Sequence, residues 1–94
     1  MIVLKTPAEM DAMRPAGRLA AQILKHLEKL IQPGISLKEL DRQAARMIRD
    51  AGAQPTYLNY RQSPDQPPFP GVITASVNDE VCHGFPDQRI LQEG

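Results

Sequence analysis

Apolar residues recur at spacings of three and four along the first third of the chain, and this pattern limits what the segment can form. Such spacing places the apolar side chains on one face of an α-helix. The stripe consists of Met10, Met13, Ala16, Gly17, Ala20, Ile23, Leu24, Leu27, Leu30 and Ile31. The run Thr6-Pro7-Ala8-Glu9 is typical of a helix start, and Gln32-Pro33-Gly34 of a stop. Because Pro15 lacks an amide hydrogen, we expect a kink near residues 11–15.

A second apolar stripe follows after a short turn and predicts a second helix. The run Ser36-Leu37-Lys38-Glu39 is typical of a capping box, and Gly52 stands where a C-terminal cap is expected. The stripe consists of Leu37, Leu40, Ala44, Met47, Ile48 and Ala51. Because the connecting turn is short, we predict that the two helices pack as an antiparallel pair.

Strand and turn composition replaces the helical pattern from Ala53 onward. Residues 56–60, 72–77 and 81–83 have strand composition, whereas residues 61–70 form a Pro-rich loop that cannot be regular structure. The pattern predicts an α+β fold in which two helices pack on short antiparallel strands. Since so few strands leave a sheet edge unpaired, we expect residues 1–94 to be a single partial domain that needs more chain or a partner.

The charge and cysteine content exclude several classes of protein. Eleven basic residues balance eleven acidic ones, which argues against electrostatic binding of nucleic acid or of an anionic membrane. One cysteine excludes an internal disulfide framework and fits a reduced, cytoplasmic compartment. No apolar run approaches the roughly 20 residues of a membrane helix, and the N-terminus does not have the pattern of a signal peptide.

Cys82 and His83 are the first candidates for chemistry. If both lie on one strand, their side chains point to opposite faces and cannot form the hydrogen bond that a nucleophilic pair requires. We therefore expect Cys82 to be a small buried hydrophobic residue. For His83, a structural role beside a turn and a functional role both stay open.

Other site chemistry is weakly indicated by the residues themselves. The two histidines and the acids in turns do not have the spacing of a metal-ligand set. Tyr57, Tyr60 and Phe69 flank the Pro-rich loop, where they either line a small apolar pocket or supply core packing. On the residues alone, packing is the favoured interpretation.

Several motifs, taken together and in order, resemble type I methionine aminopeptidases. The run SVNDEVCHGFPD at residues 76–87 is similar to the family's SVNEVVCHGIPD signature, and residues 5–18 are similar to its KTPEEIEKMRVAGR start. Further matches are Pro33-Gly34, Glu39-Leu40-Asp41 and Leu58-Asn59-Tyr60, and Leu91-Gln92-Glu93-Gly94 resembles the turn before the strand that opens the family's metal site. The resemblance covers essentially the whole chain.

The resemblance implies a fold and an activity. The family has the pita-bread fold, in which two related halves place helices outside and antiparallel strands inside. Its members remove the initiator methionine from the N-termini of nascent polypeptides, near the ribosome. They use two divalent metal ions (Co, Mn, Fe or Zn) that bridge the attacking water. This chain would then be the N-terminal half of such a domain.

The resemblance also implies roles for particular residues. The position of His83 is not a metal ligand in the family but reaches the substrate near the scissile amide. The positions of Tyr57, Tyr60, Phe69 and Thr74 surround the pocket for the methionine side chain, although many relatives have Cys in place of Thr74. Residues 62–68 are inserted relative to typical members, and the family's ligands, two Asp, one His and two Glu, all lie beyond the end of this chain.

Two hypotheses follow from these observations. In the first, the chain is the N-terminal part of a methionine aminopeptidase, and the activity belongs to a longer protein. In the second, the chain is a non-catalytic fragment that acts as an interaction module or needs a partner chain. Under both hypotheses we expect residues 1–94 alone to be inactive, because the metal ligands are absent.

Overall fold

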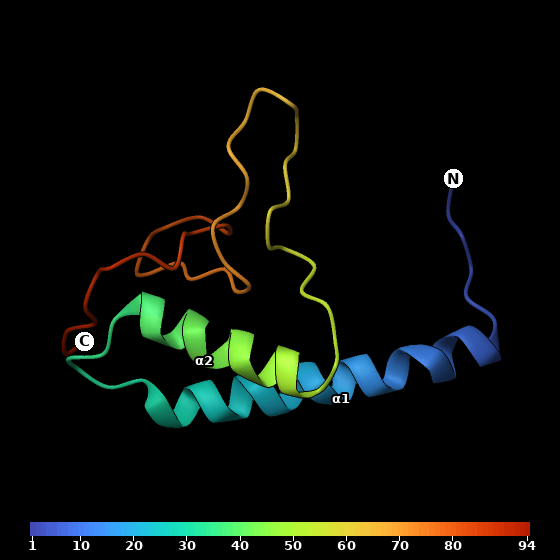
Figure 1. Cartoon of the computed structure of the whole chain (residues 1–94), viewed down its shortest axis with the longest axis horizontal. Coiled ribbons are helices and arrows are strands. Elements are labelled where there is room, and N and C mark those ends of the chain that lie inside the picture. The colour runs from blue at the N-terminus through green and yellow to red at the C-terminus, as the bar shows by residue number, and fades with distance from the viewer.

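The structure, a computed structural model, describes residues 1–94 and contains two α-helices joined by a short turn (Figure 1). Helix α1 spans Pro7–Leu30 and helix α2 spans Leu37–Asp50. The helices lie side by side and run in opposite directions, which confirms the predicted antiparallel pair. The rest of the chain, residues 51–94, folds back along one side of this pair as a long irregular segment.

Both helix starts carry the expected caps, with one difference between them. At α1, the Glu9 amide donates to Thr6 Oγ1 at 3.2 Å and the Thr6 amide donates to Glu9 Oε2 at 2.9 Å, which completes a capping box. At α2, the Glu39 amide donates to Ser36 Oγ at 3.0 Å. The Glu39 carboxylate instead accepts from Arg42 and Gln43, so only half of the predicted second box forms.

The C-terminal end of α2 is closed by the predicted glycine. Gly52 has a φ of 68°, a conformation that favours a residue without Cβ. The amide of Gly52 donates to Arg49 O at 3.0 Å, and the amide of Ala53 donates to Ile48 O at 3.0 Å. These two bonds form a Schellman motif, which satisfies carbonyls that the end of a helix leaves free.

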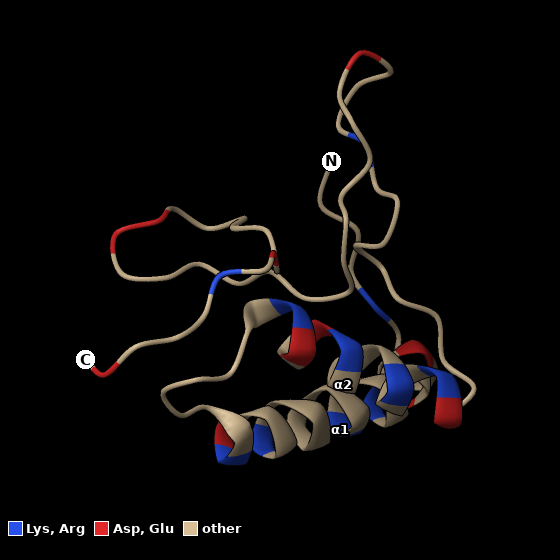
Figure 2. Cartoon of the chain, turned by 60° about the vertical axis from the view of Figure 1, so that its left-hand side comes forward, with Lys and Arg blue, Asp and Glu red and all other residues tan.

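The core lies where the C-terminal half of α1 packs on α2. Its buried residues are Ile23, Leu27, Leu37, Leu40 and Ala44. The first half of α1 contributes nothing to it, since Met10 is 45% and Met13 is 56% exposed. At 1.5 Å per residue, the 14 residues of α2 are too short to cover the 24 residues of α1. Charged residues of both signs are distributed along both helices (Figure 2).

The predicted strands do not form, so the expected packing of helices on antiparallel strands is absent from residues 1–94. One isolated antiparallel bridge joins Ser36 to Ile90. Residues 72–77 form no ladder, because only one backbone bond, from the Ala75 amide to Gly84 O at 2.9 Å, joins them to residues 81–94. A positive φ of 50° at Cys82 also breaks the extended backbone that residues 81–83 would need. Strand composition alone therefore does not produce a strand where no neighbouring segment pairs with it.

The irregular segment is held against α2 by a half-buried carboxylate and by backbone hydrogen bonds. Asp41 Oδ1 accepts from the amides of Val72, at 2.7 Å, and Ile73, at 3.1 Å. Farther along, the amide of Leu37 donates to Arg89 O at 2.9 Å, and the amide of Leu91 donates to Ile35 O at 2.8 Å. Neither helix has the length and apolar character needed to cross a membrane.

Candidate functional site

Aromatic side chains from the irregular segment surround an open pocket of about 900 Å³. The lining residues are Thr56, Tyr57, Tyr60, Gln62, Gln66, Pro67, Phe69, His83 and Phe85. We call this cavity the aromatic pocket. Four of the five site residues named from the sequence line it: Tyr57, Tyr60, Phe69 and His83.

The rings of the aromatic pocket contact one another in a continuous series. The ring centroids of His83 and Tyr57 are 6.3 Å apart, those of Tyr57 and Phe69 are 5.8 Å apart, and those of Phe69 and Phe85 are 5.4 Å apart. The last pair meets edge to face, at an interplanar angle of 81°. Tilted and edge-to-face pairs are the favourable arrangements of aromatic rings. The series therefore gives the pocket an apolar wall that ends at an imidazole.

Backbone bonds hold two sides of this wall together. The amide of Asn59 donates to Phe69 O at 3.0 Å, and the amide of Phe69 donates to Tyr60 O at 2.8 Å. Asn59 has a φ of 64°, in the left-handed region that Asn tolerates better than most residues. These bonds close the base of the loop formed by residues 61–68, so the tyrosines before the loop and Phe69 after it lie together.

His83 and Cys82 are both exposed, and their side chains approach each other. The distance from Cys82 Sγ to His83 Nε2 is 3.7 Å. The expectation of a buried Cys82 is wrong, because it assumed a strand, and the positive φ of Cys82 turns the two side chains to the same side. No carboxylate hydrogen-bonds to His83, so the imidazole lacks the orienting acid of a catalytic triad.

Gly84 fixes the turn that carries His83. Its amide donates to Ser76 Oγ at 2.9 Å, and its carbonyl accepts from the Ala75 amide at 2.9 Å. A Cβ at Gly84 would collide with Ala75 O and would lie 2.8 Å from Ser76 Cα. Only glycine allows the two stretches of backbone to come this close.

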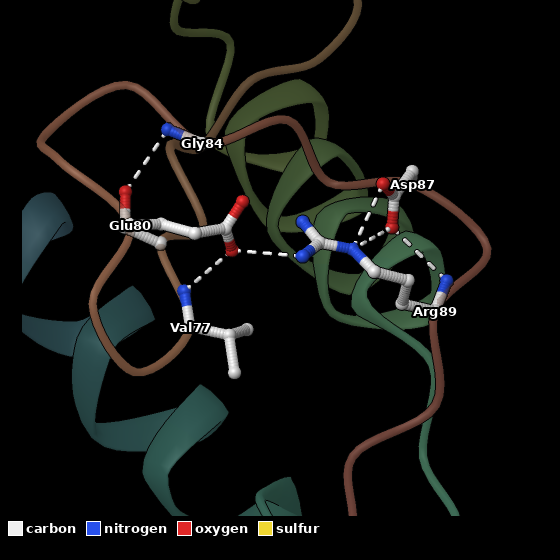
Figure 3. A network of polar contacts seen from close by, with 6 residues as sticks. Val77, Glu80, Gly84, Asp87 and Arg89 are labelled. Carbon is white, nitrogen blue, oxygen red and sulfur yellow. Dashed lines mark hydrogen bonds and ion pairs between the residues drawn. The ribbon is translucent and has the colours of Figure 1, made fainter.

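An arginine joins both ends of the same turn (Figure 3). Arg89 Nη1 donates to Glu80 Oε1 at 2.9 Å, and Arg89 Nε donates to Asp87 Oδ1 at 2.9 Å. The Glu80 carboxylate also accepts from the Val77 amide at 2.8 Å. Hydrogen bonds from the Arg89 side chain are the main reason that the pKa values of Glu80 and Asp87 lie below their ordinary values.

Thr74 does not line the aromatic pocket. Its neighbours Ile73 and Ala75 pack against the helical core, and the Ile73 amide donates to Asp41. The segment around Thr74 is therefore held against α2. The sequence interpretation also missed Phe85, although an aromatic residue two positions after a candidate histidine was an available signal.

Residues 1–94 do not offer a site for a metal ion. No group of three or more His, Cys, Asp or Glu side chains lies close enough together to hold one. A second cavity of about 880 Å³ lies between the interhelical turn and residues 89–94, and its lining includes Arg89 and Glu93 but no histidine or cysteine. No chemical step through a metal can be assigned to these residues.

Comparisons with known proteins place the chain in a family. The model of a family described as "Metallopeptidase family M24" matches residues 11–94. Methionine aminopeptidase B of Synechocystis sp. is 45% identical over 94 residues, which cover 99% of this chain and 34% of that protein. Methionine aminopeptidase 1 of Bacillus subtilis is 46% identical, over 100% of this chain and 36% of that protein.

The likeness extends to three dimensions. A solved structure of a methionine aminopeptidase from Streptococci matches with a TM-score of 0.90 and 33% identity, over 100% of this chain and 33% of that one. The chain thus spans about a third of the length of the relatives that it matches. Because the family model covers most of its residues, the chain belongs to metallopeptidase family M24.

Proposed function

We propose that residues 1–94 are the N-terminal portion of a methionine aminopeptidase, a hydrolase that removes the initiator methionine from new proteins. The names of the relatives support this activity. The single observation that carries it is the aromatic pocket with an imidazole at one end. Such a pocket has the two parts that this reaction needs, a place for one apolar side chain and a polar group beside it.

In this proposal, Tyr57, Tyr60 and Phe69 hold the methionine side chain. A thioether is flexible and polarisable, and it makes favourable contacts with the edges of aromatic rings. Phe85 extends the same wall through its edge-to-face contact with Phe69. Thr74 acts from outside the pocket, through the stretch of backbone that Asp41 holds against α2.

His83 binds the substrate beside the scissile amide. An imidazole N–H there can donate to the carbonyl oxygen on which negative charge develops in the transition state. The only side chain that hydrogen-bonds to it in the structure is Cys82, and a thiol is a weak hydrogen-bonding group that substrate can replace. The rigid turn around Gly84 and Arg89 keeps the imidazole in place.

The metal chemistry of this function would come from outside residues 1–94. Two divalent metal ions (Co, Mn, Fe or Zn) would supply the activated water. Since residues 1–94 contain no fitting donor group, we propose that the ligands belong to the rest of the protein and that this stretch alone is inactive. The substrate would be the N-terminus of a nascent polypeptide, met in the cytoplasm and near the ribosome.

A second possibility has an observation in its favour, namely the uncovered apolar residues at the start of the chain. The large apolar side chains among residues 1–13 that are exposed are Met1, Ile2, Val3, Leu4, Met10 and Met13. They would suit a chain that needs a partner. The intact mass of the natural protein separates the two: a mass well above 10.4 kDa supports the aminopeptidase, and a mass of 10.4 kDa supports the partner-dependent fragment.

The test of the function is methionine release by the natural protein at its full length. His83→Ala should lower kcat by about 10²–10³, as expected for the loss of one transition-state contact. Cys82→Ala, one residue away on the same exposed turn, is the matched control and should retain activity. Metal content should be unchanged in both variants. Loss of metal from His83→Ala would overturn the proposed role, because it would make His83 a ligand or a structural support.

A further inference from the structure

The loop formed by residues 61–68 places two carboxamides on the rim of the aromatic pocket. Gln62 and Gln66 both line the pocket, and both are exposed. They are the only side chains of that lining, apart from His83, Thr56 and the tyrosines, that can form hydrogen bonds. An apolar side chain bound among the rings cannot form hydrogen bonds with these two carboxamides.

Neither carboxamide is hydrogen-bonded to another residue of the chain. The structure contains no hydrogen bond to the side chain of Gln62 or Gln66. Gln43 on α2 behaves differently, since its Nε2 donates to Glu39 at 2.9 Å and its Oε1 lies 3.3 Å from His26 Nε2. The two loop carboxamides are therefore available to a ligand.

The loop itself is held in shape although it has no regular structure. Its base is closed by the backbone bonds between Asn59, Tyr60 and Phe69. Across the loop, the backbone amide of Gln66 donates to Ser63 O at 3.1 Å, and Arg61 Nη1 donates to the backbone carbonyl of Gln66 at 3.2 Å. Prolines at positions 64, 67 and 68 fix further backbone angles. A loop restrained in this way loses little freedom when a ligand binds.

We infer that Gln62 and Gln66 bind the main chain of the substrate peptide beyond its methionine, and so make the protein selective for longer peptides. This inference rests on the proposed function. A carboxamide carries both a donor and an acceptor, which matches the N–H and C=O groups of a peptide backbone and is independent of side-chain sequence. The rings select the first residue, and the loop contacts the residues that follow.

The experiment compares peptides of increasing length in the natural full-length protein. The substrates are the C-terminal amides of Met-Ala, Met-Ala-Ser and Met-Ala-Ser-Gly, and the variant is Q62A/Q66A. We expect kcat/KM for the two longer peptides to fall about tenfold through KM, the size expected for two lost hydrogen bonds, with Met-Ala changed less than twofold. Q62M/Q66M keeps the side-chain length without the amides and should show the same loss. Gln54→Ala, an exposed position in the same segment that does not line the pocket, should show none.

Each other result contradicts the inference in a recognisable way. An equal loss for all three peptides would mean that the glutamines only shape the pocket. Unchanged kinetics for every peptide would mean that they do not contact substrate. Release of no methionine from any peptide by the unmodified protein would instead overturn the proposed function, and the inference with it.

Discussion

Residues 7–50 form two helices with local hydrogen bonds, whereas residues 53–94 form neither a helix nor a strand. Of the 48 backbone hydrogen bonds, 28 lie within the helices. The later segment is held instead by isolated backbone bonds and by side chains that accept from backbone amides, as Asp41 does from Val72 and Glu80 does from Val77. The aromatic pocket is built entirely by this second region.

The comparison shows that regular structure and site precision are separate properties. A helix tolerates the replacement of most exposed residues, because its backbone bonds do not depend on them. An irregular segment holds its shape through a few specific close approaches and polar anchors. Substitutions at those positions should therefore have much larger effects than chemically similar substitutions on the helices.

The largest difference in stability should come from replacing one glycine by alanine in each region. Gly84→Ala forces Ala75 and Ser76 away from the turn that carries His83, and we expect a loss of about 3 kcal/mol in unfolding free energy together with most of the activity. Gly17→Ala lies in α1 with no atom within 4 Å of the new Cβ, and we expect a gain of up to about 1 kcal/mol. Urea unfolding of the natural protein measures both. Equal effects of the two substitutions would contradict the distinction.

A smaller effect should follow from removing the anchor between the regions. Asp41→Ala leaves the amides of Val72 and Ile73 without their acceptor, and we expect a loss of about 1–3 kcal/mol. Asp41→Asn retains the accepting oxygen and should lose less. Asp50→Ala, an exposed position at the end of α2, is the control and should change stability little. An Asp41→Ala protein as stable as this control would show that the segment does not need the anchor.

The sequence was sufficient to predict the helices, and the reason is the local nature of helix signals. Thr6, Ser36 and Gly52 mark the ends of the helices in the sequence, and each caps a helix as expected. The extent of the core was not predictable from the stripe on α1, because burial of Met10 and Met13 depends on how far α2 reaches. The predicted strands failed for the same reason, since pairing requires a neighbour that composition does not reveal.

The site was only partly predictable. Motif resemblance named five residues, of which the structure brings four to one pocket, while the role of Thr74 outside that pocket stays a prediction. The contact between Cys82 and His83 depends on a positive φ at Cys82, which neither composition nor spacing indicates for a cysteine. The carboxamides Gln62 and Gln66 lie in the Pro-rich loop, which the sequence interpretation treated as an insertion without naming site residues in it.

A third effect, of about 1 kcal/mol, should separate the two helix caps. Ser36 caps α2 next to the buried Leu37 and bridges to Ile90, so Ser36→Ala should lower global stability by that amount. Thr6 caps the exposed end of α1, which can fray without unfolding the core. Thr6→Ala should therefore speed hydrogen exchange in the first turns of α1 and leave the urea midpoint nearly unchanged. A large shift of the midpoint would mean that this end is packed in the natural protein.

The smallest effect concerns the exposed ion pairs, and it should depend on pH. Hydrogen bonds from Arg42, and then from Gln43, lower the pKa of Glu39 from 4.5 to about 2. Because the folded state holds this carboxylate ionised, its contribution to stability is complete above pH 4.5, declines below that pH and is lost as the pH falls through about 2. Glu39→Gln should thus be less stable than the unmodified protein at pH 7, with a difference that shrinks steadily toward pH 2, measured by urea unfolding at each pH. Glu28→Gln is the control, because the Glu28 side chain forms no hydrogen bond or ion pair.

Glu80→Gln tests the same argument in the irregular segment, where Arg89 and the Val77 amide both lower the pKa of Glu80. A stability difference that stayed constant from pH 7 to pH 2 would show that these carboxylates act through packing, and the two regions would then differ in geometry but not in electrostatics.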